Sequence, residues 1–445
     1  MVKVKVLSAS VGAALLFGAV GSAQAATATQ DVASLKAQVA ELQQMVQQLS
    51  NQQQNQAVQL QQQSEIAAKT APVAAPTVAS GKPGWLTLPD GQTQVKLYGS
   101  VRVDGTYDLK GNPSASISNN SNAVPLNSAN ATKNSMNVTA ATSRIGLDIV
   151  RPTEHGDLTG KIEADFMGSS GTNGSGAFRV RHAYLSLGNW LVGQTTSPFV
   201  NADTAPDTVD FNGPMGYGAT RTVQVRYTQP LTANQKLLVA LEGGDVDNFS
   251  GATQTSGGSR FPALTARYDV ATADKKGLLQ VHALAHENRV STNDDNDQEK
   301  WGWGVGLGGK YSLTPNDTVF ANYYHVKGDS KYLLYVNNAY TVTGDGTTTD
   351  YTINLGEYDT GLIGYGHKWN PQWRSNVAAG GIWYKDNGTY GAAANKNLYN
   401  ILVNSFYTPV KNLDLGMEYT YGQRKTFSSQ EGDYSRVNLM AKYSF

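Results

Sequence analysis

The chain has 445 residues, with 35 Lys and Arg against 35 Asp and Glu, so its formal net charge at pH 7 is +0. This balance gives no sign of nucleic-acid binding. The chain has no cysteine, which excludes a disulfide framework and thiolate metal sites. Its 46 glycines and 23 tyrosines suit tight turns and the aromatic girdles found at membrane interfaces.

Residues 1–25 have the pattern of a secretory signal peptide. Lys3 and Lys5 precede an apolar run from Val11 to Val20, and Ala23-Gln-Ala25 forms an A-x-A cleavage site. A transmembrane helix needs roughly 20 apolar residues, which is longer than this run. We therefore expect export across the inner membrane, with the mature chain beginning near Ala26.

Residues 26–70 are predicted to form an α-helical coiled coil, which would serve as an oligomerisation stalk. Apolar residues recur there at spacings of three and four, namely at Val32, Leu35, Val39, Leu42, Val46 and Leu49, with Leu60 in the same register. The glutamine-rich positions that follow leave a frayed or disordered tail as the alternative. Valine at a with leucine at d nominally favours two strands, so the stalk alone does not indicate a trimer. Residues 71–93 include a proline- and alanine-rich stretch and are predicted to be a linker.

Residues 94–445 are predicted to form an all-β domain, a transmembrane antiparallel β-barrel of about 16 strands. Segments near ten residues long, with alternating apolar and polar side chains, suit tilted membrane-spanning strands. The sixteen segments are 94–107, 142–151, 157–167, 177–188, 189–197, 220–229, 236–244, 260–270, 276–287, 301–312, 316–328, 357–369, 372–385, 397–408, 411–423 and 433–445.

The connections between these segments alternate between short and long. Short turns, such as Asn370-Pro371, are rich in turn residues, whereas every second connection is long and polar. Outer-membrane barrels have short periplasmic turns and longer outside loops. We therefore expect both ends of the barrel, and the stalk, on the periplasmic side. We also expect the long loops to lack apolar clusters, and 111–140 to be mobile outside the cell.

Side-chain alternation assigns the charged residues of the strands to the barrel interior. An Arg or Lys that faces lipid near the bilayer midplane costs about 2–4 kcal/mol. In the first strand this cost places Leu97 and Val101 outward and Arg102 inward. The same rule predicts a set of pore-lining, substrate-binding residues: Arg102, Arg144, Lys161, Arg179, Arg181, Arg226 and Arg267.

One strand breaks the alternation. In segment 177–188, Leu185 and Leu187 share the parity of Arg179 and Arg181. Both pairs cannot face their preferred surroundings on a regular strand, because alternate side chains point to opposite faces. The sequence therefore predicts either a β-bulge or a face covered by protein.

The arginines predict a preference for anions, because the planar guanidinium fork binds carboxylates bidentately. The alternative is that these arginines only neutralise Asp104, Asp148, Glu163 and Asp165. The third long loop, 198–219, is predicted to fold into the barrel as a constriction loop. Its carboxylates Asp203, Asp207 and Asp210 would then face the basic wall and create a transverse field. The alternative is an ordinary exposed loop.

Trp301–Gly309 alternates bulky residues with glycine. Trp301, Trp303, Val305 and Leu307 are predicted to face outward. The intervening glycines would face inward and leave that part of the wall uncluttered.

No catalytic, metal-binding or cofactor motif appears. His282 and His286 share a strand face but lie about 13 Å apart, which is too far to chelate one metal. We therefore expect that the protein is not an enzyme and that it needs no cofactor.

The whole mature chain resembles the DcaP-like trimeric porins of Gram-negative outer membranes. The resemblance is carried by the stalk from Val32 to Leu60, by Gly84-Trp-Leu-Thr-Leu-Pro89, by Val95-Lys-Leu-Tyr-Gly-Ser-Val-Arg-Val-Asp104 and by the terminal strand that ends at Phe445. It implies a sixteen-stranded homotrimer that passes dicarboxylates and other small anions.

These observations together predict an outer-membrane diffusion channel for small anionic solutes, surrounded by outer-membrane lipid. Two alternatives remain open. A sugar-selective porin would need a run of aromatic residues along the lumen, for which Tyr98 is one candidate. A structural outer-membrane protein would instead be tethered by its stalk to the cell wall.

Overall fold

The computed structural model describes residues 83–445 apart from 112–116, 118–120, 129–132, 169–175, 244–248, 252–255, 292–296 and 345–350, together with Gln44, Gln47 and residues 77–78. The chain divides into two units, Met1–Ala75 and Pro76–Phe445. In the first unit, Gln44 and Gln47 are helical and exposed. The signal peptide and the rest of the predicted coiled coil lie outside the described residues. Within the described part of the chain, no helix is long and apolar enough to cross a membrane.

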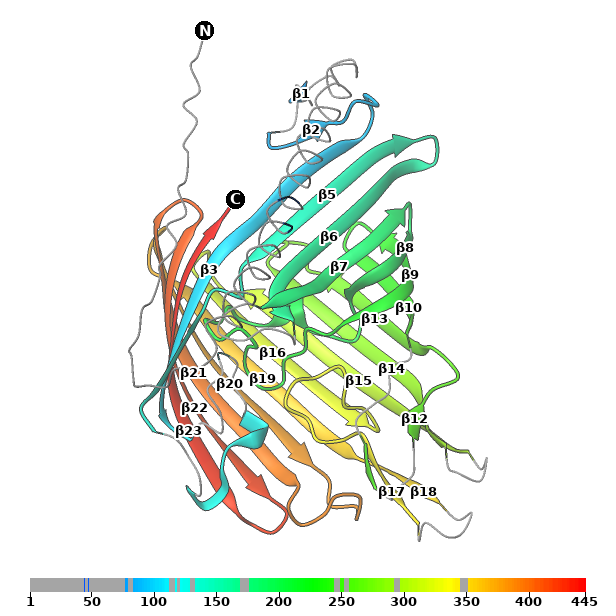
Figure 1. Ribbon diagram of the computed structural model, residues 1–445, viewed down its shortest axis with the longest axis vertical. Helices are drawn as coiled ribbons and strands as arrows, with labels where there is room; N and C mark the ends of the chain where they lie inside the picture. The colour runs from blue at the N-terminus through cyan, green and yellow to red at the C-terminus, as the bar shows by residue number, and fades with distance from the viewer. Residues whose placement is uncertain are drawn as a thin grey trace, which may run out of the picture. The chain divides into compact units, whose positions relative to one another are not determined.

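Sixteen antiparallel strands form the wall of the second unit, and each pairs with the next around a closed ring (Figure 1). All sixteen predicted segments are confirmed, with ends that differ by at most four residues. The strands are β3 (Gln94–Lys110), β5 (Arg144–Thr153), β6 (Gly156–Gly168), β7 (Ala177–Leu187), β8 (Trp190–Thr196), β9 (Arg221–Thr232), β10 (Gln235–Glu242), β13 (Ala263–Ala271), β14 (Gly277–Ser291), β15 (Gln298–Ser312), β16 (Asp317–Lys327), β19 (Glu357–Lys368), β20 (Trp373–Tyr384), β21 (Asn395–Val410), β22 (Leu413–Thr426) and β23 (Glu431–Ser444).

The ring closes where the last strand meets the first. Strand β23 pairs with β3 in a register that puts Met440 opposite Asp104. Beyond the strand, Phe445 and Gly99 exchange two backbone hydrogen bonds, each 3.1 Å long. Closure satisfies the backbone groups of every barrel strand within the sheet, which is the condition for crossing a bilayer with strands.

The other strands are short and lie in the connections. Strands β1 (Thr77–Val78) and β2 (Leu86–Thr87) pair with each other, and β2 pairs with the start of β3. Part of the predicted linker therefore adds to the sheet. Strands β4 (Ser135–Thr139) and β12 (Ser256–Gly258) extend the barrel sheet, whereas β11 (Phe249–Gly251), β17 (Tyr340–Thr343) and β18 (Thr352–Leu355) form a separate sheet.

The two ends of the barrel differ as the sequence predicts. All the short turns lie at one end, the upper end in Figure 1, and the long loops lie at the other. We call these the turn end and the loop end. The alternation follows from the antiparallel order, because consecutive connections must lie at opposite ends.

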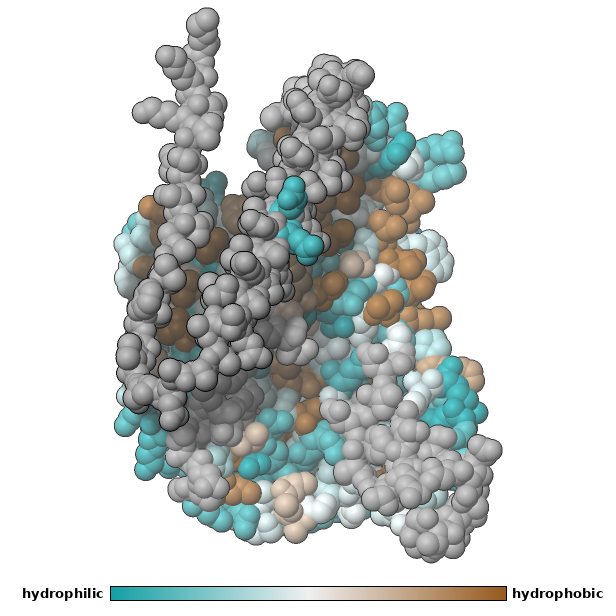
Figure 2. Space-filling view, in the orientation of Figure 1, coloured by the Kyte–Doolittle hydropathy of each residue, from teal (hydrophilic) through white to brown (hydrophobic). Residues whose placement is uncertain are grey.

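The outer surface is apolar around the ring. Leu97 is 56% exposed and Val305 is 48% exposed, as are many other large apolar side chains of the predicted outward parity. Figure 2 shows hydrophobic residues gathered over β7 to β10, with hydrophilic residues above and below them. Water is not the partner of such a surface, so this band is the lipid- or subunit-facing part of the barrel.

The broken parity in β7 is explained by a β-bulge. The pairing with β6 passes from Glu163 opposite His182 to Ala164 opposite Val180, which leaves Arg181 as an additional residue. Arg181 is buried in the interior, while Leu185 is 59% exposed on the outer face. The bulge thus lets one strand send its arginines inward and its leucines outward.

Long loops fold into the barrel interior. The loop after β16 contradicts the prediction that the long loops lack apolar clusters, because its Tyr332, Leu333 and Tyr335 belong to the largest buried apolar cluster. The prediction for 111–140 is also wrong for the described 3₁₀ turns η1 (Ser121–Ala123) and η2 (Leu126–Ser128). The Ser121 hydroxyl lies 2.9 Å from the hydroxyl of Tyr434, which faces the interior from β23.

Candidate functional site

The loop between β8 and β9 crosses the barrel interior. We call residues 198–219 the inner loop. Its backbone reaches the far wall, where the N–H groups of Val209 and Asp210 donate to the Glu418 carboxylate at 2.9 and 3.1 Å. Nearby, the N–H of Met215 donates to Asn400 at 3.2 Å. Strands far apart around the ring are therefore joined through the inner loop, which narrows the interior.

The side chain that anchors the inner loop, Glu418 of β22, is fully buried. Besides the two backbone donors, it accepts from the amides of Asn404 at 3.0 Å and Asn438 at 3.2 Å. A buried carboxylate is stable only when its lone pairs are satisfied, and here these four donors and the Thr420 hydroxyl, at 3.4 Å, satisfy it. No motif marks this residue, although its inward parity on β22 is visible in the sequence.

The inward glycines of β15 are covered, so the prediction that they leave this part of the wall uncluttered is wrong. The inner loop covers Gly304 and Gly308, whereas Tyr324 of β16 covers Gly306. A Cβ at Gly304 would lie 2.6 Å from the ring of Phe199. Further along the inner loop, the hydroxyl of Thr204 lies over Gly308 and donates to the side chain of Asn322 at 2.7 Å. The missing side chains thus make room for the loop rather than for solvent.

A second loop covers the inner loop from the loop end. We call residues 328–339 the cap loop. The hydroxyl of Tyr335 donates to Gly213 O at 3.3 Å, and the N–H of Leu334 donates to Tyr217 O at 3.1 Å. The inner loop is therefore held both by the far wall and by the cap loop.

The wall formed by β3 to β9 carries a dense group of cations. Arg102, Arg144 and Arg179 surround the ring of Phe211, a residue of the inner loop, with guanidinium carbons 5.6, 6.0 and 5.8 Å from its centroid. Such distances allow cation–π attraction. The basic wall therefore faces an aromatic side chain of the inner loop across the barrel interior.

Three of the predicted arginines are tightly paired. Arg102 lies 2.6 Å from Asp104, and it also donates to Val209 O at 2.8 Å. Arg179 and Arg181 share Asp165, at 2.7 and 2.8 Å. Arg181 also binds Glu163 and is only 5% exposed. For these residues the neutralising role that the sequence left open is present in the structure.

Two predicted arginines have little compensation. The closest carboxylate to Arg144 is Glu163, at 4.0 Å. Arg226 forms no ion pair with any described residue, and its Nε has no hydrogen-bond partner there. Arg221, at the start of β9, is not among the predicted residues. It also forms no ion pair with any described residue, and its Nε has no hydrogen-bond partner there. Positive charge on this wall therefore exceeds the negative charge that is paired with it.

The remaining predicted cations lie apart from this group. Lys161 contacts Asp148 at 2.5 Å and the Tyr98 hydroxyl at 3.0 Å. Arg267, on β13, binds Asp269 at 2.9 Å and lies 3.4 Å from Asp203 of the inner loop. The structure therefore brings Arg102, Arg144, Arg179 and Arg181 together but does not unite all seven residues in one site.

The three carboxylates of the inner loop have different surroundings. The side chains of Asp203 and Asp207 are 53% and 72% exposed, and Asp207 lies 3.6 Å from Nε of Arg374. Asp210 is buried near Glu418, and burial together with this charge raises the pKa of Asp210 from 3.8 to about 7. Only Asp203 and Asp207 can therefore meet a solute directly.

Three further interior cations are not among the predicted pore-lining residues. Lys310, Arg374 and Lys442 all lie on the inward parity of their strands, the same signal that selected the arginines of the early strands. Among the described residues, no group of three His, Cys, Asp or Glu side chains is placed to hold a metal ion.

A closed sixteen-stranded barrel with an apolar outer band, a charged interior and an inward-folded loop is the architecture of an outer-membrane channel. The model of the DcaP outer membrane protein family matches residues 19–445, and the chain belongs to this family. Its family and structural neighbours are outer-membrane channels rather than enzymes.

The chain is 35% identical to the outer-membrane channel DcaP of Acinetobacter baumannii, whose crystal structure superposes with a TM-score of 0.72 over 80% of this chain and 98% of that one. An anion-selective porin from Comamonas acidovorans is 11% identical, with a TM-score of 0.53 over 80% and 100% of the two chains. OmpF of Salmonella typhi, in complex with daunomycin, is 14% identical, with a TM-score of 0.51 over 80% and 98%. The last two likenesses concern the fold alone. A comparison with curated protein sequences gives no match.

Proposed function

We propose that this channel prefers small anions, with dicarboxylates as its main solutes. The observation that carries the proposal is the excess of cations on the wall of β3 to β9, where Arg144, Arg221 and Arg226 lack a close carboxylate among the described residues. A narrow, low-dielectric passage amplifies such an imbalance, because the field of uncompensated charges is focused in it. The dicarboxylate preference is what the resemblance to the DcaP-like porins implies.

The arrangement of loops supports the proposal. The inner loop binds the wall of β15 to β22, and η1 lies against β21 and β22, where Arg424 donates to Asn122 O at 2.9 Å. The inner loop also reaches the basic wall, where Phe211 lies among Arg102, Arg144 and Arg179. A solute that passes between the inner loop and this wall would therefore meet the arginines.

Reversal potentials in a salt gradient across a planar bilayer test this proposal. We expect a potential whose sign corresponds to anion preference, and we expect its magnitude to fall at high salt, where the screening length is about 3 Å at 1 M. A potential of the opposite sign would contradict the proposal. Sugars that permeate faster than dicarboxylates would favour the sugar-selective alternative.

We further propose that the channel assembles as a homotrimer through the outer faces of β3 to β10. Among the described residues, this half of the ring exposes three large aromatic side chains, Tyr107, Phe178 and Trp190, whereas the half from Phe261 to Phe445 exposes thirteen. Aromatic girdles mark lipid-facing surfaces, so the aliphatic half suits contact with other subunits. Charge substitution at Val101 should dissociate the trimer in native electrophoresis, whereas the same change at Val403 should not. Val101 and Val403 are 58% and 53% exposed.

A further inference from the structure

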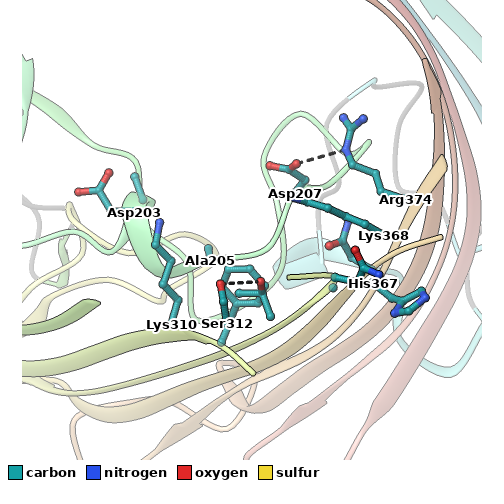
Figure 3. A pocket seen from close by; sticks show the side chains of 14 residues that line it. Asp203, Ala205, Asp207, Lys310, Ser312, His367, Lys368 and Arg374 are labelled. Atoms are coloured by element: carbon teal, nitrogen blue, oxygen red, sulfur yellow. Dashed lines mark hydrogen bonds and ion pairs between the residues drawn. The ribbon is translucent and has the colours of Figure 1, made fainter. Parts of the chain in front are cut away.

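A pocket lies between the inner loop and strands β15, β16, β19 and β20, near the turn end (Figure 3). Its volume is about 460 Å³, enough for a small organic solute. The wall strands contribute Lys310, Lys368 and Arg374, while the inner loop contributes Asp203 and Asp207. This pocket is separate from the arginine group around Phe211, because those arginines lie on β3, β5 and β7.

The cations of the pocket are not all neutralised by the protein. In the described part of the chain, Lys310 and Lys368 form no ion pair. Arg374 is held in place by Asp414 at 3.2 Å and by the ring of Phe406, 4.4 Å from its guanidinium carbon. Two ammonium groups are thus available to a carboxylate that enters the pocket.

The loop side of the pocket offers the opposite charge. Asp203 and Asp207 retain exposed side chains, although each lies within 3.4–3.6 Å of an arginine nitrogen. Figure 3 shows the Lys310 ammonium pointing toward the side of the pocket where Asp203 lies, yet no ion pair within 4.0 Å joins the two. The pocket therefore offers both ammonium groups and exposed carboxylates, and among the described residues neither Lys310 nor Lys368 is joined to a carboxylate by an ion pair.

We propose that this pocket binds small solutes that carry both a carboxylate and an ammonium group, with acidic amino acids as the best fit. A carboxylate of the solute would lie against Lys310 or Lys368, and its ammonium group against Asp203 or Asp207. Acidic amino acids suit the whole path, because their net negative charge also suits the arginine wall. This inference rests on the proposed anion-preferring channel and names a solute class for it.

The ammonium requirement can be isolated with a matched pair of probes. Glutamate and glutarate have the same carbon chain and two carboxylates, but only glutamate has an ammonium group. In single-channel recordings of the full-length protein, glutamate added on the turn-end side should interrupt the current with an apparent affinity roughly fivefold higher than that of glutarate. A factor of this size corresponds to one partly exposed ion pair.

Two sets of variants assign the charges. Lys310→Gln with Lys368→Gln should weaken block by both probes, whereas Asp203→Asn with Asp207→Asn should remove the advantage of glutamate over glutarate without weakening block by glutarate. Lys96→Gln is the matched control, because Lys96 also faces the interior near the turn end but lies on β3, outside the pocket. Heat-modifiable electrophoretic mobility verifies that each variant is folded.

The outcomes separate this inference from the proposed function. Equal block of the wild-type channel by glutamate and glutarate would overturn the inference. The inference would also be overturned if glutamate and glutarate blocked the lysine variant as strongly as they block the Lys96→Gln control. In either case, an anion-selective reversal potential would leave the proposed function intact, whereas its absence in the wild type would contradict the proposed function itself.

Discussion

The two walls of the barrel interior use polar residues for different purposes. The wall of β3 to β9 carries arginines whose charge exceeds that of their carboxylate partners. The wall of β15 to β22 holds buried amides at Asn322, Asn400 and Asn404, and its carboxylate Glu418 binds backbone N–H groups of the inner loop. Cations of this wall line the pocket near the turn end. The first wall thus presents arginines to solutes, and the second holds the loop that narrows the passage. Selectivity and aperture should therefore respond to different substitutions.

The largest expected effect follows from removing the anchor of the inner loop. Glu418→Ala leaves the donors of Val209, Asp210, Asn404 and Asn438 without their acceptor. Buried donors without a partner cost about 1–3 kcal/mol each, so the inner loop should leave the far wall. We expect a higher single-channel conductance and a lower unfolding temperature.

Glu418→Gln is the matched control, because its amide keeps one acceptor oxygen. It should lie between the wild type and the alanine variant in conductance. A wild-type conductance for Glu418→Ala would show that the cap loop alone holds the inner loop.

A smaller effect is expected at the glycines beneath the inner loop. Gly304→Val introduces a side chain against Phe199, whereas Gly309→Val on the outer face meets only ordinary contacts. Overpacking costs about 1–3 kcal/mol, so Gly304→Val should lower the free energy of unfolding in urea by this amount. Equal stability of the two variants would mean that Phe199 can move aside freely.

Substitution of a loosely paired arginine in the basic wall should change the ion selectivity without changing the width of the passage. Arg144→Ser removes a cation that has no close partner, and we expect the anion-to-cation permeability ratio to fall about threefold, as for a unit charge near a solvated path. Arg181→Ser should instead destabilise the barrel, because Glu163 and Asp165 lose a buried partner. Reversal potentials and thermal unfolding of both variants measure the contrast. A stable Arg181→Ser channel with reduced selectivity would contradict the distinction between the closely paired Arg181 and the loosely paired Arg144.

The smallest effect concerns pH and the inner loop. The pKa of Asp210 is raised from 3.8 to about 7, so the folded loop binds a proton that the released loop gives up. The stability of the loop should therefore be highest near pH 4, decline as the pH rises toward 7, and level off above it. Asp210→Asn should remove this decline, which is measured as open-channel current noise against pH. Identical profiles for the two proteins would contradict the assignment.

The strands could be predicted from the sequence because lipid imposes a strict rule on them. A parity error exposes charge to hydrocarbon, so Leu97 and Arg102 could be assigned to opposite faces without any knowledge of the fold. The same rule located the irregularity in β7, although it could not distinguish a bulge from a covered face.

The arrangement of the interior could not be predicted in the same way. Parity shows that Arg144 and Arg181 both face inward, but the difference between them arises from neighbours on other strands. The inward folding of the cap loop depends on Tyr332 and Leu333 finding an apolar cluster built by distant segments. Glu418 has no sequence signal of its role, because its partners on the inner loop are backbone N–H groups that any residue could supply.

The bulge in β7 divides one strand into two halves with independent phases. Arg181, the additional residue, lets the loop-end half present arginines to the interior while the turn-end half keeps Leu185 and Leu187 on the outer face. Deletion of that residue would place Val180 directly before His182, which restores a regular strand in which both halves keep their present faces. The additional codon therefore adds one arginine to the interior without moving any other side chain of the strand between the channel and its surroundings, which no point substitution in a regular strand can do.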